Sequence, residues 1–256
     1  MFRPRLIPVL LLKNGALVKS IKFKNYKYIG DPINAVKIFN DLRADELVLL
    51  DIDATSKGKR ISSDVIKRVG EEANMPFSVG GGISDMKDIQ ELIACGAEKV
   101  ILNSHAVKNP LFIQQASENF GSSTIVLCID IKKKFFRNSN YVFINNGKVA
   151  TKYDPIKWAQ LAEEMGAGEI IIQSISKDGT MEGYDLELLK SISDAVTIPT
   201  VALGGAGNFS DFQSAYSLGR VNGIAAGSFF VYQGRNKGVL INYPSSEDVI
   251  RINHLT

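Results

Sequence analysis

The chain has 256 residues, of which 45% are hydrophobic and 22% are charged, and its formal net charge is +3. This composition is typical of a globular protein that buries a large core, so it excludes a disordered chain and gives no need for a stabilising disulfide or metal. The small net charge argues against nucleic acid as a partner, and no apolar run reaches the roughly 18 residues of a membrane span. We expect a cytoplasmic protein without a membrane partner.

Apolar, strand-like runs alternate with helix-like runs along the chain. Strands are expected at residues 5–12, 46–51, 77–79, 100–103, 124–130, 169–174, 200–203 and 223–226. Helical patterns lie between them, for example at 31–44, 62–73, 85–96 and 154–166. Eight strands alternating with helices predict an α/β fold with a parallel sheet, closed into a (β/α)8 TIM barrel that forms one domain over residues 1–256.

The two halves of the chain resemble each other. A shift of 123 positions, without a gap, superimposes the glycine-rich segments and the residues around them. The matched pairs are Pro76 and Pro199, Gly81 and Gly204, Gly82 and Gly205, Gly96 and Gly219, and Ile101 and Ile224. One constant offset predicts two duplicated half-barrels. A doubly wound open sheet would also explain the alternation of strands and helices, but it would not explain this repeat.

Two smaller features complete the predicted architecture. Residues 141–150 read as a hairpin that turns at Asn146-Gly147, an excursion after the fifth strand and near Asp130. Cys95 and Cys128 both lie in apolar segments. We expect buried, reduced thiols rather than a disulfide.

Glycine-rich loops follow the third, sixth and seventh expected strands. In a barrel, the loops after the strands form the functional site, and glycine lets backbone N–H groups approach a phosphate without an intervening Cβ. These loops and the ends of the fourth and eighth strands predict two sites for a phosphorylated small molecule. The first consists of Gly82, Asn103 and Ser104, and the second of Gly179, Gly205, Ala226 and Gly227. The alternative is that these glycines only make tight turns.

Several motifs resemble the cyclase subunit of imidazole glycerol phosphate synthase along nearly the whole chain. They are RLIP, DELVLLDIDA, PFSVGGGI, GAEKVILNS, IVLCID, GAGEIIIQSISKDGTMEGYD and GGAG. The resemblance implies a (β/α)8 barrel that forms a heterodimer with a glutaminase subunit. Ammonia released at the bottom of the barrel would pass through it to a bisphosphate substrate at the top, where cyclisation and cleavage give imidazole glycerol phosphate.

The resemblance assigns the chemistry to two aspartates, at the ends of the first and fifth strands. Asp130 matches the second of these, but Leu11 stands at the position of the first. Other departures are Ser176 in place of the usual acid, Leu203 in place of a small polar residue, and Gly227 in place of a serine. We therefore expect impaired cyclase activity in a lyase-type subunit.

Two further segments, 22–32 and 237–244, resemble a divergent branch of the family, and the stretch 237–256 is shorter than the usual C-terminal helix. Members of that branch accompany a glutaminase-like protein and a sugar amidotransferase. They are thought to supply ammonia for the amidation of a surface-glycan sugar. This resemblance implies a sugar amidotransferase as a second partner.

Four charged residues begin expected strands: Arg5, Glu46, Lys99 and Glu169. Strand N-termini converge at the bottom of a barrel, where these charges could form a salt-bridged ring. The alternative is that each is an ordinary solvated charge. The resemblance implies a ring that gates the ammonia passage.

Three charged residues are expected near the substrate. Lys19 lies in a lysine-rich segment that we expect to be a mobile basic loop, and it matches a family lysine that assists turnover. Asp51, paired with Asp53 at the end of the second strand, could hold substrate or position a loop. Asp178, after the sixth strand, is expected in a substrate loop. His105 is expected to be structural. No metal-ligand spacing of Cys or His occurs, so we expect neither a metal nor another cofactor.

Three functions remain open at this point. The favoured one is an ammonia-conducting subunit without full cyclase chemistry. The second is a true cyclase of histidine biosynthesis. The third is an isomerase-like barrel that acts alone on a phosphosugar, but this also requires two catalytic aspartates, so Leu11 counts against it.

Overall fold

A closed barrel of parallel strands forms the centre of the protein. The computed structural model describes residues 3–133, 139–234 and 236–252. Around the barrel, the strands are β1 (Arg5–Lys13), β4 (Leu47–Asp51), β5 (Phe77–Gly80), β6 (Lys99–Leu102), β7 (Ile125–Lys133), β10 (Glu169–Ser174), β11 (Thr200–Leu203) and β12 (Gly223–Ala226). Parallel pairing of β12 with β1 closes the ring. The predicted (β/α)8 TIM barrel is confirmed, and the open sheet is wrong.

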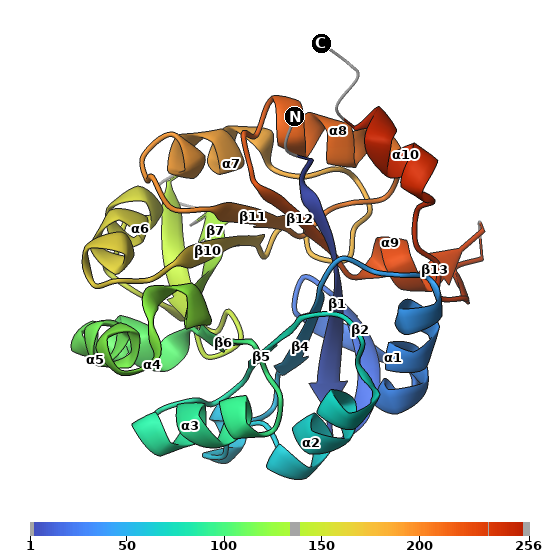
Figure 1. The fold of residues 1–256 in the computed structure, drawn as a ribbon. Coiled ribbons are helices and arrows are strands. Elements are labelled where there is room, and N and C mark those ends of the chain that lie inside the picture. The colour runs from blue at the N-terminus through green and yellow to red at the C-terminus, as the bar shows by residue number, and fades with distance from the viewer. Residues whose placement is uncertain (1–2, 134–138, 235, 253–256) are drawn as a thin grey trace.

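Helices surround the barrel on its outer side (Figure 1). They are α1 (Pro32–Asp41), α2 (Ser63–Glu72), α3 (Met86–Ala94), α5 (Leu111–Phe120), α6 (Pro155–Glu164), α7 (Leu186–Ser193) and α8 (Phe209–Ser217). Short helices α4 (Ser104–Lys108) and α9 (Ser228–Val231) follow β6 and β12, and α10 (Ser246–Arg251) lies beside α8. Two 3₁₀ turns lie at Thr55–Lys57 and Ser122–Thr124. No helix in the described ranges is long and apolar enough to cross a membrane.

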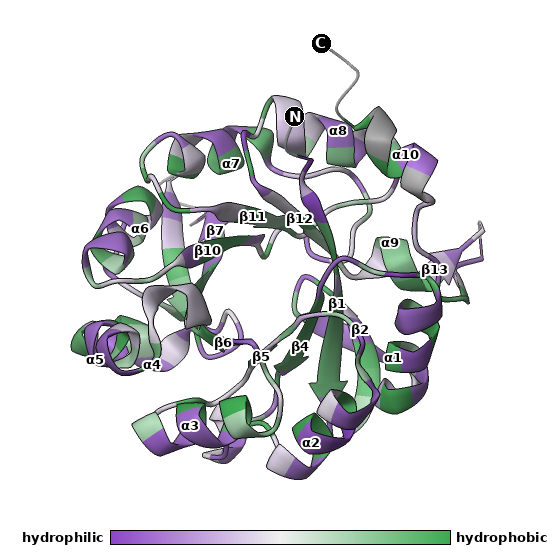
Figure 2. Ribbon diagram, viewed as in Figure 1, coloured by the Kyte–Doolittle hydropathy of each residue, from purple (hydrophilic) through white to green (hydrophobic). Residues whose placement is uncertain are grey.

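The side chains of each strand alternate between two apolar layers. Along β1, Leu6, Leu10 and Leu12 face the helices, whereas Ile7 and Val9 face the barrel interior. The colouring by hydropathy shows the apolar strands at the centre and hydrophilic residues toward the outer helix faces (Figure 2). This alternation explains why the strand is apolar throughout: both of its faces are buried.

The repeat seen in the sequence recurs in the backbone. Asp85 caps α3 and forms a capping box with Asp88, and Asn208 caps α8 and forms the same box with Asp211. Asp85 and Asn208 are 123 positions apart, and so are Asp88 and Asp211, which is the offset found between the two glycine-rich segments. Equivalent helices therefore begin with equivalent hydrogen bonds, which supports the interpretation as two duplicated half-barrels.

The lysine-rich segment before α1 forms a hairpin rather than the expected loop. Strand β2 (Ala16–Ile21) pairs antiparallel with β1 and with β3 (Lys24–Gly30). Lys19, expected in a mobile loop, is buried on β2 with 4% of its surface exposed. The prediction of a loop is wrong because β3 is an outer strand whose side chains are mostly exposed, and its lysines conceal the strand pattern.

The hairpin after the fifth barrel strand is confirmed. Strand β8 (Asn140–Ile144) pairs with β7 and with β9 (Val149–Ala150), and the turn between β8 and β9 contains Asn146 and Gly147. A further short hairpin joins β13 (Tyr232–Gln233) to β14 (Gly238–Val239). In the C-terminal stretch, α10 is short, as expected, and residues 253–256 lie outside the described residues.

The two cysteines are free thiols. Cys128 is buried in the barrel, which confirms that expectation, whereas Cys95 at the end of α3 is only half-buried.

Tyr243 ties the C-terminal segment to the start of the barrel. Its hydroxyl donates to the Leu6 carbonyl oxygen at 3.0 Å and accepts from the Asp45 backbone N–H at 3.0 Å. Its ring stacks on Phe230, with the ring centroids 5.5 Å apart.

We expect Tyr243→Phe to lower the free energy of unfolding by about 1–3 kcal/mol, because two backbone groups lose their partner. The matched control is Tyr28→Phe, since Tyr28 is 66% exposed; it should change stability by less than about 0.5 kcal/mol. Urea unfolding followed by circular dichroism measures both. Equal midpoints for the two variants would contradict this role.

Candidate functional site

A cavity of about 480 Å³ opens at the C-terminal ends of the barrel strands. We call it the upper cavity. It brings together every residue predicted for the top of the barrel, namely Leu11, Lys19, Asp51, Gly82, Asn103, Ser104, Asp130, Asp178, Gly179, Gly205, Ala226 and Gly227. Residues that are far apart in the sequence therefore meet in one place, as the loops of a barrel require. Their individual roles remain predictions.

Asp130 and Leu11 lie on opposite walls of this cavity. Three strands separate β7 from β1 in either direction around the barrel. Asp130 is buried, and its burial raises the pKa of the carboxyl group to about 7, although the nearby Asn103 amide and Cys128 thiol act in the opposite direction. Such a group can both give and accept a proton near neutral pH. Leu11, facing it, can do neither.

The floor of the cavity is polar on one side and apolar on the other. Asn103 lines it directly after the end of β6, and Asp130 and Gln173 line it from β7 and β10. Leu11, Leu50 and Leu203 line it from β1, β4 and β11. A ligand would therefore find hydrogen-bonding groups along one edge and apolar contacts along the other.

Gln173 is a candidate that the sequence analysis missed. It pairs in register with Asp130, and it is 4% exposed. Within the described part of the chain its amide nitrogen has no hydrogen-bond partner. A buried amide of this kind is available to a ligand, and the signal in the sequence was a polar residue ending the apolar run EIII.

The predicted phosphate-binding turns have the backbone conformation that requires glycine. Gly82 and Gly179 have φ angles of +69° and +66°, and a Cβ at either position would overlap a backbone carbonyl oxygen, of Lys59 or of Ser20. Among the described residues, the N–H groups of Gly82, Gly179, Gly205 and Gly227 make none of the recorded hydrogen bonds of turns and loops. Donors of this kind, at the rim of a cavity, fit an anionic group.

The acidic residues beside the cavity position its loops. Asp51 accepts hydrogen bonds from the backbone N–H groups of Asp53 and Ala54 at 3.0 and 3.1 Å, and burial raises its pKa. Asp178 accepts from the Ser20 hydroxyl at 2.8 Å and the Phe23 N–H at 3.2 Å. These contacts favour loop positioning over direct chemistry for both aspartates.

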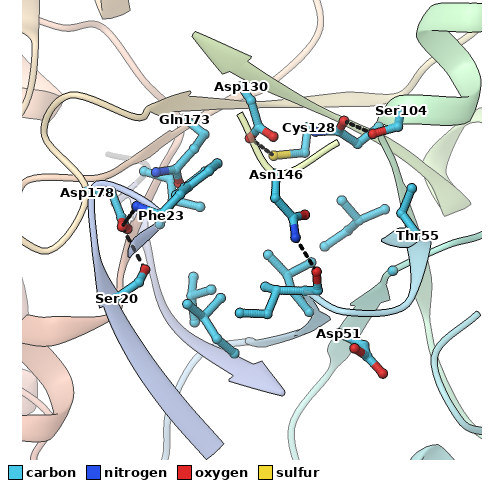
Figure 3. Close-up of a pocket in the computed structure, with 18 of the residues that line it drawn as sticks. Ser20, Phe23, Asp51, Thr55, Ser104, Cys128, Asp130, Asn146, Gln173 and Asp178 are labelled. Atoms are coloured by element: carbon cyan, nitrogen blue, oxygen red, sulfur yellow. Dashed lines mark hydrogen bonds between the residues drawn. The ribbon is translucent and has the colours of Figure 1, made fainter. Parts of the chain in front are cut away.

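Two hairpins contribute side chains to the lining of the cavity (Figure 3). Phe23, at the tip of the β2–β3 hairpin, lines the cavity, and a Cβ on Gly147 would lie 3.2 Å from its ring. Asn146 projects from the β8–β9 turn and its amide donates to the Ile52 carbonyl oxygen at 2.5 Å. The sequence analysis placed the second hairpin near Asp130 but did not identify Phe23 or Asn146 as part of the site.

At the opposite end of the barrel, the four predicted charges form a closed ring of ion pairs, which we call the charge ring. Arg5 pairs with both Glu46 and Glu169. Lys99 lies 3.4 Å from Glu46 and 2.9 Å from Glu169. Both glutamates are buried, so these are not ordinary solvated charges. The predicted ring is present, and its role as a gate stays a prediction.

His105 lines the cavity and packs edge-on against Phe112, with the ring centroids 4.7 Å apart. This contact is consistent with the expected structural role. In residues 3–133, 139–234 and 236–252, no group of three or more His, Cys, Asp or Glu side chains could hold a metal ion.

Comparison with known proteins places the chain in a family. Residues 5–237 match the family described as "Histidine biosynthesis protein". A Leptospira interrogans protein, provisionally named imidazole glycerol phosphate synthase subunit HisF, is 46% identical over 97% of this chain and 98% of its own length. A Pseudomonas aeruginosa protein with the provisional name hisF2 is 42% identical over 95% and 97%. Imidazole glycerol phosphate synthase subunit HisF of Clostridium botulinum is 40% identical over 96% and 98%. The chain thus belongs to the histidine biosynthesis protein family, among relatives named as HisF subunits.

Proposed function

We propose that this protein is the synthase subunit of a glutamine-dependent amidotransferase of the imidazole glycerol phosphate synthase type. A glutaminase would bind at the charge ring, and ammonia would pass through the barrel to a phosphorylated substrate in the upper cavity. The observation that carries the proposal is the arrangement of three layers in one barrel interior: a charge ring, an apolar middle and a cavity with free N–H donors.

The middle layer is suited to a small neutral molecule. It consists of Ile7, Val9, Val48, Ile101, Val126, Cys128, Ile171, Val201, Leu203 and Ala225. Four of these, Val9, Ile101, Cys128 and Leu203, also line the upper cavity, so the two layers adjoin. Ammonia is neutral and crosses an apolar region more easily than ammonium, whose desolvation is costly. The charge ring in front of this layer would control entry, because its ion pairs must rearrange to open a passage.

Two versions of this function differ in the chemistry at the top. The names of the relatives support the first, in which the protein is a complete cyclase subunit of histidine biosynthesis. The pairing of Asp130 with Leu11 across the cavity favours the second, in which ammonia is passed on to a sugar amidotransferase for a surface-glycan sugar. The names of the relatives give no support to sugar amidation, so the first version is the better supported.

We expect the upper cavity to bind inorganic phosphate in titration calorimetry at millimolar concentration. Gly82→Ala should abolish binding at the first site, because its Cβ would displace the turn that presents the N–H group. The matched control is Gly234→Ala: Gly234 has the same φ of +69° but no atoms within 4 Å of its Cβ position. An unmodified protein that binds no phosphate would contradict the proposed cavity.

We expect Lys99→Met to weaken glutaminase stimulation at least tenfold in a mixture with the cognate glutaminase, because Glu46 and Glu169 lose a shared cation. Lys190→Met, on helix α7, is the control. Urea midpoints show whether either variant is merely unfolded. Stimulation that is equal in Lys99→Met and in the control would rule out the charge ring as the coupling element.

A turnover assay with the bisphosphate substrate and ammonium separates the two versions. A missing acid–base group typically costs about 10²–10⁴-fold in rate. In the second version Leu11 supplies no such group, so turnover by the unmodified chain would be close to that of Asp130→Asn, whereas the better supported first version predicts robust turnover. Robust turnover that Asp130→Asn removes would instead establish the complete cyclase and exclude the sugar-amidation version.

A further inference from the structure

Lys19 is a buried cation without a matching anion. It is 4% exposed and lines the upper cavity. Its ammonium group donates to the Val9 carbonyl oxygen, and no carboxylate of a described residue lies within ion-pairing distance. An ammonium group has three donors, so two remain available. A buried charge with so few partners is unfavourable, and an anion in the cavity would offset that cost.

Gly227 is fitted to this lysine. A Cβ at position 227 would lie 2.5 Å from the Lys19 ammonium nitrogen and 3.3 Å from its Cε. The backbone of Gly227, with φ −104° and ψ −65°, is open to any residue. A side chain at position 227 would therefore displace the end of the Lys19 side chain rather than strain the backbone. Without a side chain, Gly227 leaves the space in which the ammonium group lies.

We propose that Lys19 is the counter-ion of the second anion site, formed with Gly179, Gly205, Ala226 and Gly227, and that it selects a dianionic phosphate end of the substrate for that site. The inference rests on the proposed phosphate-binding function and deepens it. Gly227 contributes by making room, so Lys19 and Gly227 act as one unit.

The charge of Lys19 depends on pH. Burial lowers its pKa to about 8, and Asp178 acts in the opposite direction. Asp130, with a pKa of about 7, is a further titratable group that lines the same cavity. Lys27 is opposite Lys19 in the hairpin register, but its ammonium lies over the Tyr232 ring. The ammonium form, and with it the proposed anion binding, should therefore be lost as the pH rises through about 8.

Sulfate is the suitable probe because it remains a dianion from pH 7 to 9.5. Titration calorimetry on the full chain should show sulfate binding that weakens as the pH rises above 8. Lys19→Met should bind about 10- to 100-fold more weakly at pH 7, as expected for a lost charged hydrogen bond, with little further change above pH 8. Asp130 is retained in both proteins, so their difference isolates Lys19.

The proposed coupling of Lys19 and Gly227 is tested by Gly227→Ser and by the double variant that combines it with Lys19→Met. Gly227→Ser alone should weaken sulfate binding about as much as Lys19→Met, because the new side chain displaces the ammonium. The double variant should be no weaker than Lys19→Met alone. If the losses of sulfate affinity in the two single variants multiply in the double variant, this inference is wrong. It is also wrong if Lys19→Met binds sulfate as tightly as the unmodified chain. Neither result would contradict the proposed phosphate-binding cavity. Absence of sulfate binding in the unmodified chain would overturn both.

Discussion

Closure of the barrel is the constraint on which the other features depend. When β12 pairs with β1, side chains on every strand alternate strictly between the helices and the interior. The interior positions then stack in layers, so that strand starts form the charge ring, strand centres form the apolar middle and strand ends form the upper cavity. A shift of one strand by one residue would move Arg5 or Asp130 to the outer face and dismantle both ends.

The buried charges at the two ends are stabilised in different ways. In the charge ring, two cations alternate with two carboxylates, so each charge is compensated inside the protein. In the upper cavity, Lys19 has no such partner among the described residues, and Asp130 is held with its pKa raised to about 7. The first arrangement is suited to a closed, stable element, whereas the second leaves binding capacity for a ligand. This difference supports the proposal that one end of the barrel meets a protein partner and the other binds a small molecule.

The sequence predicted the barrel well because both determinants are local. Eight apolar runs and a constant offset between glycine-rich turns are visible without any long-range contact, and the same offset recurs in the capping boxes of α3 and α8. The prediction from sequence failed for the β2–β3 hairpin, because its exposed strand β3 is as rich in lysine as a loop. The burial of Lys19 depends on packing between strands that are distant in the sequence, so no local pattern could reveal it. For Gln173, the sequence showed a polar residue at the end of an apolar run, but the missing partner of its amide depends on the same long-range packing.

Hydrogen–deuterium exchange tests the central claim, that opposite ends of the barrel serve a protein partner and a phosphorylated ligand. The cognate glutaminase should slow exchange in the segments that carry Arg5, Glu46, Lys99 and Glu169 and leave the glycine-rich turns unchanged. Sulfate should do the reverse, slowing exchange around Gly82 and Gly205. Protection by the glutaminase that is confined to the glycine-rich turns would contradict the account.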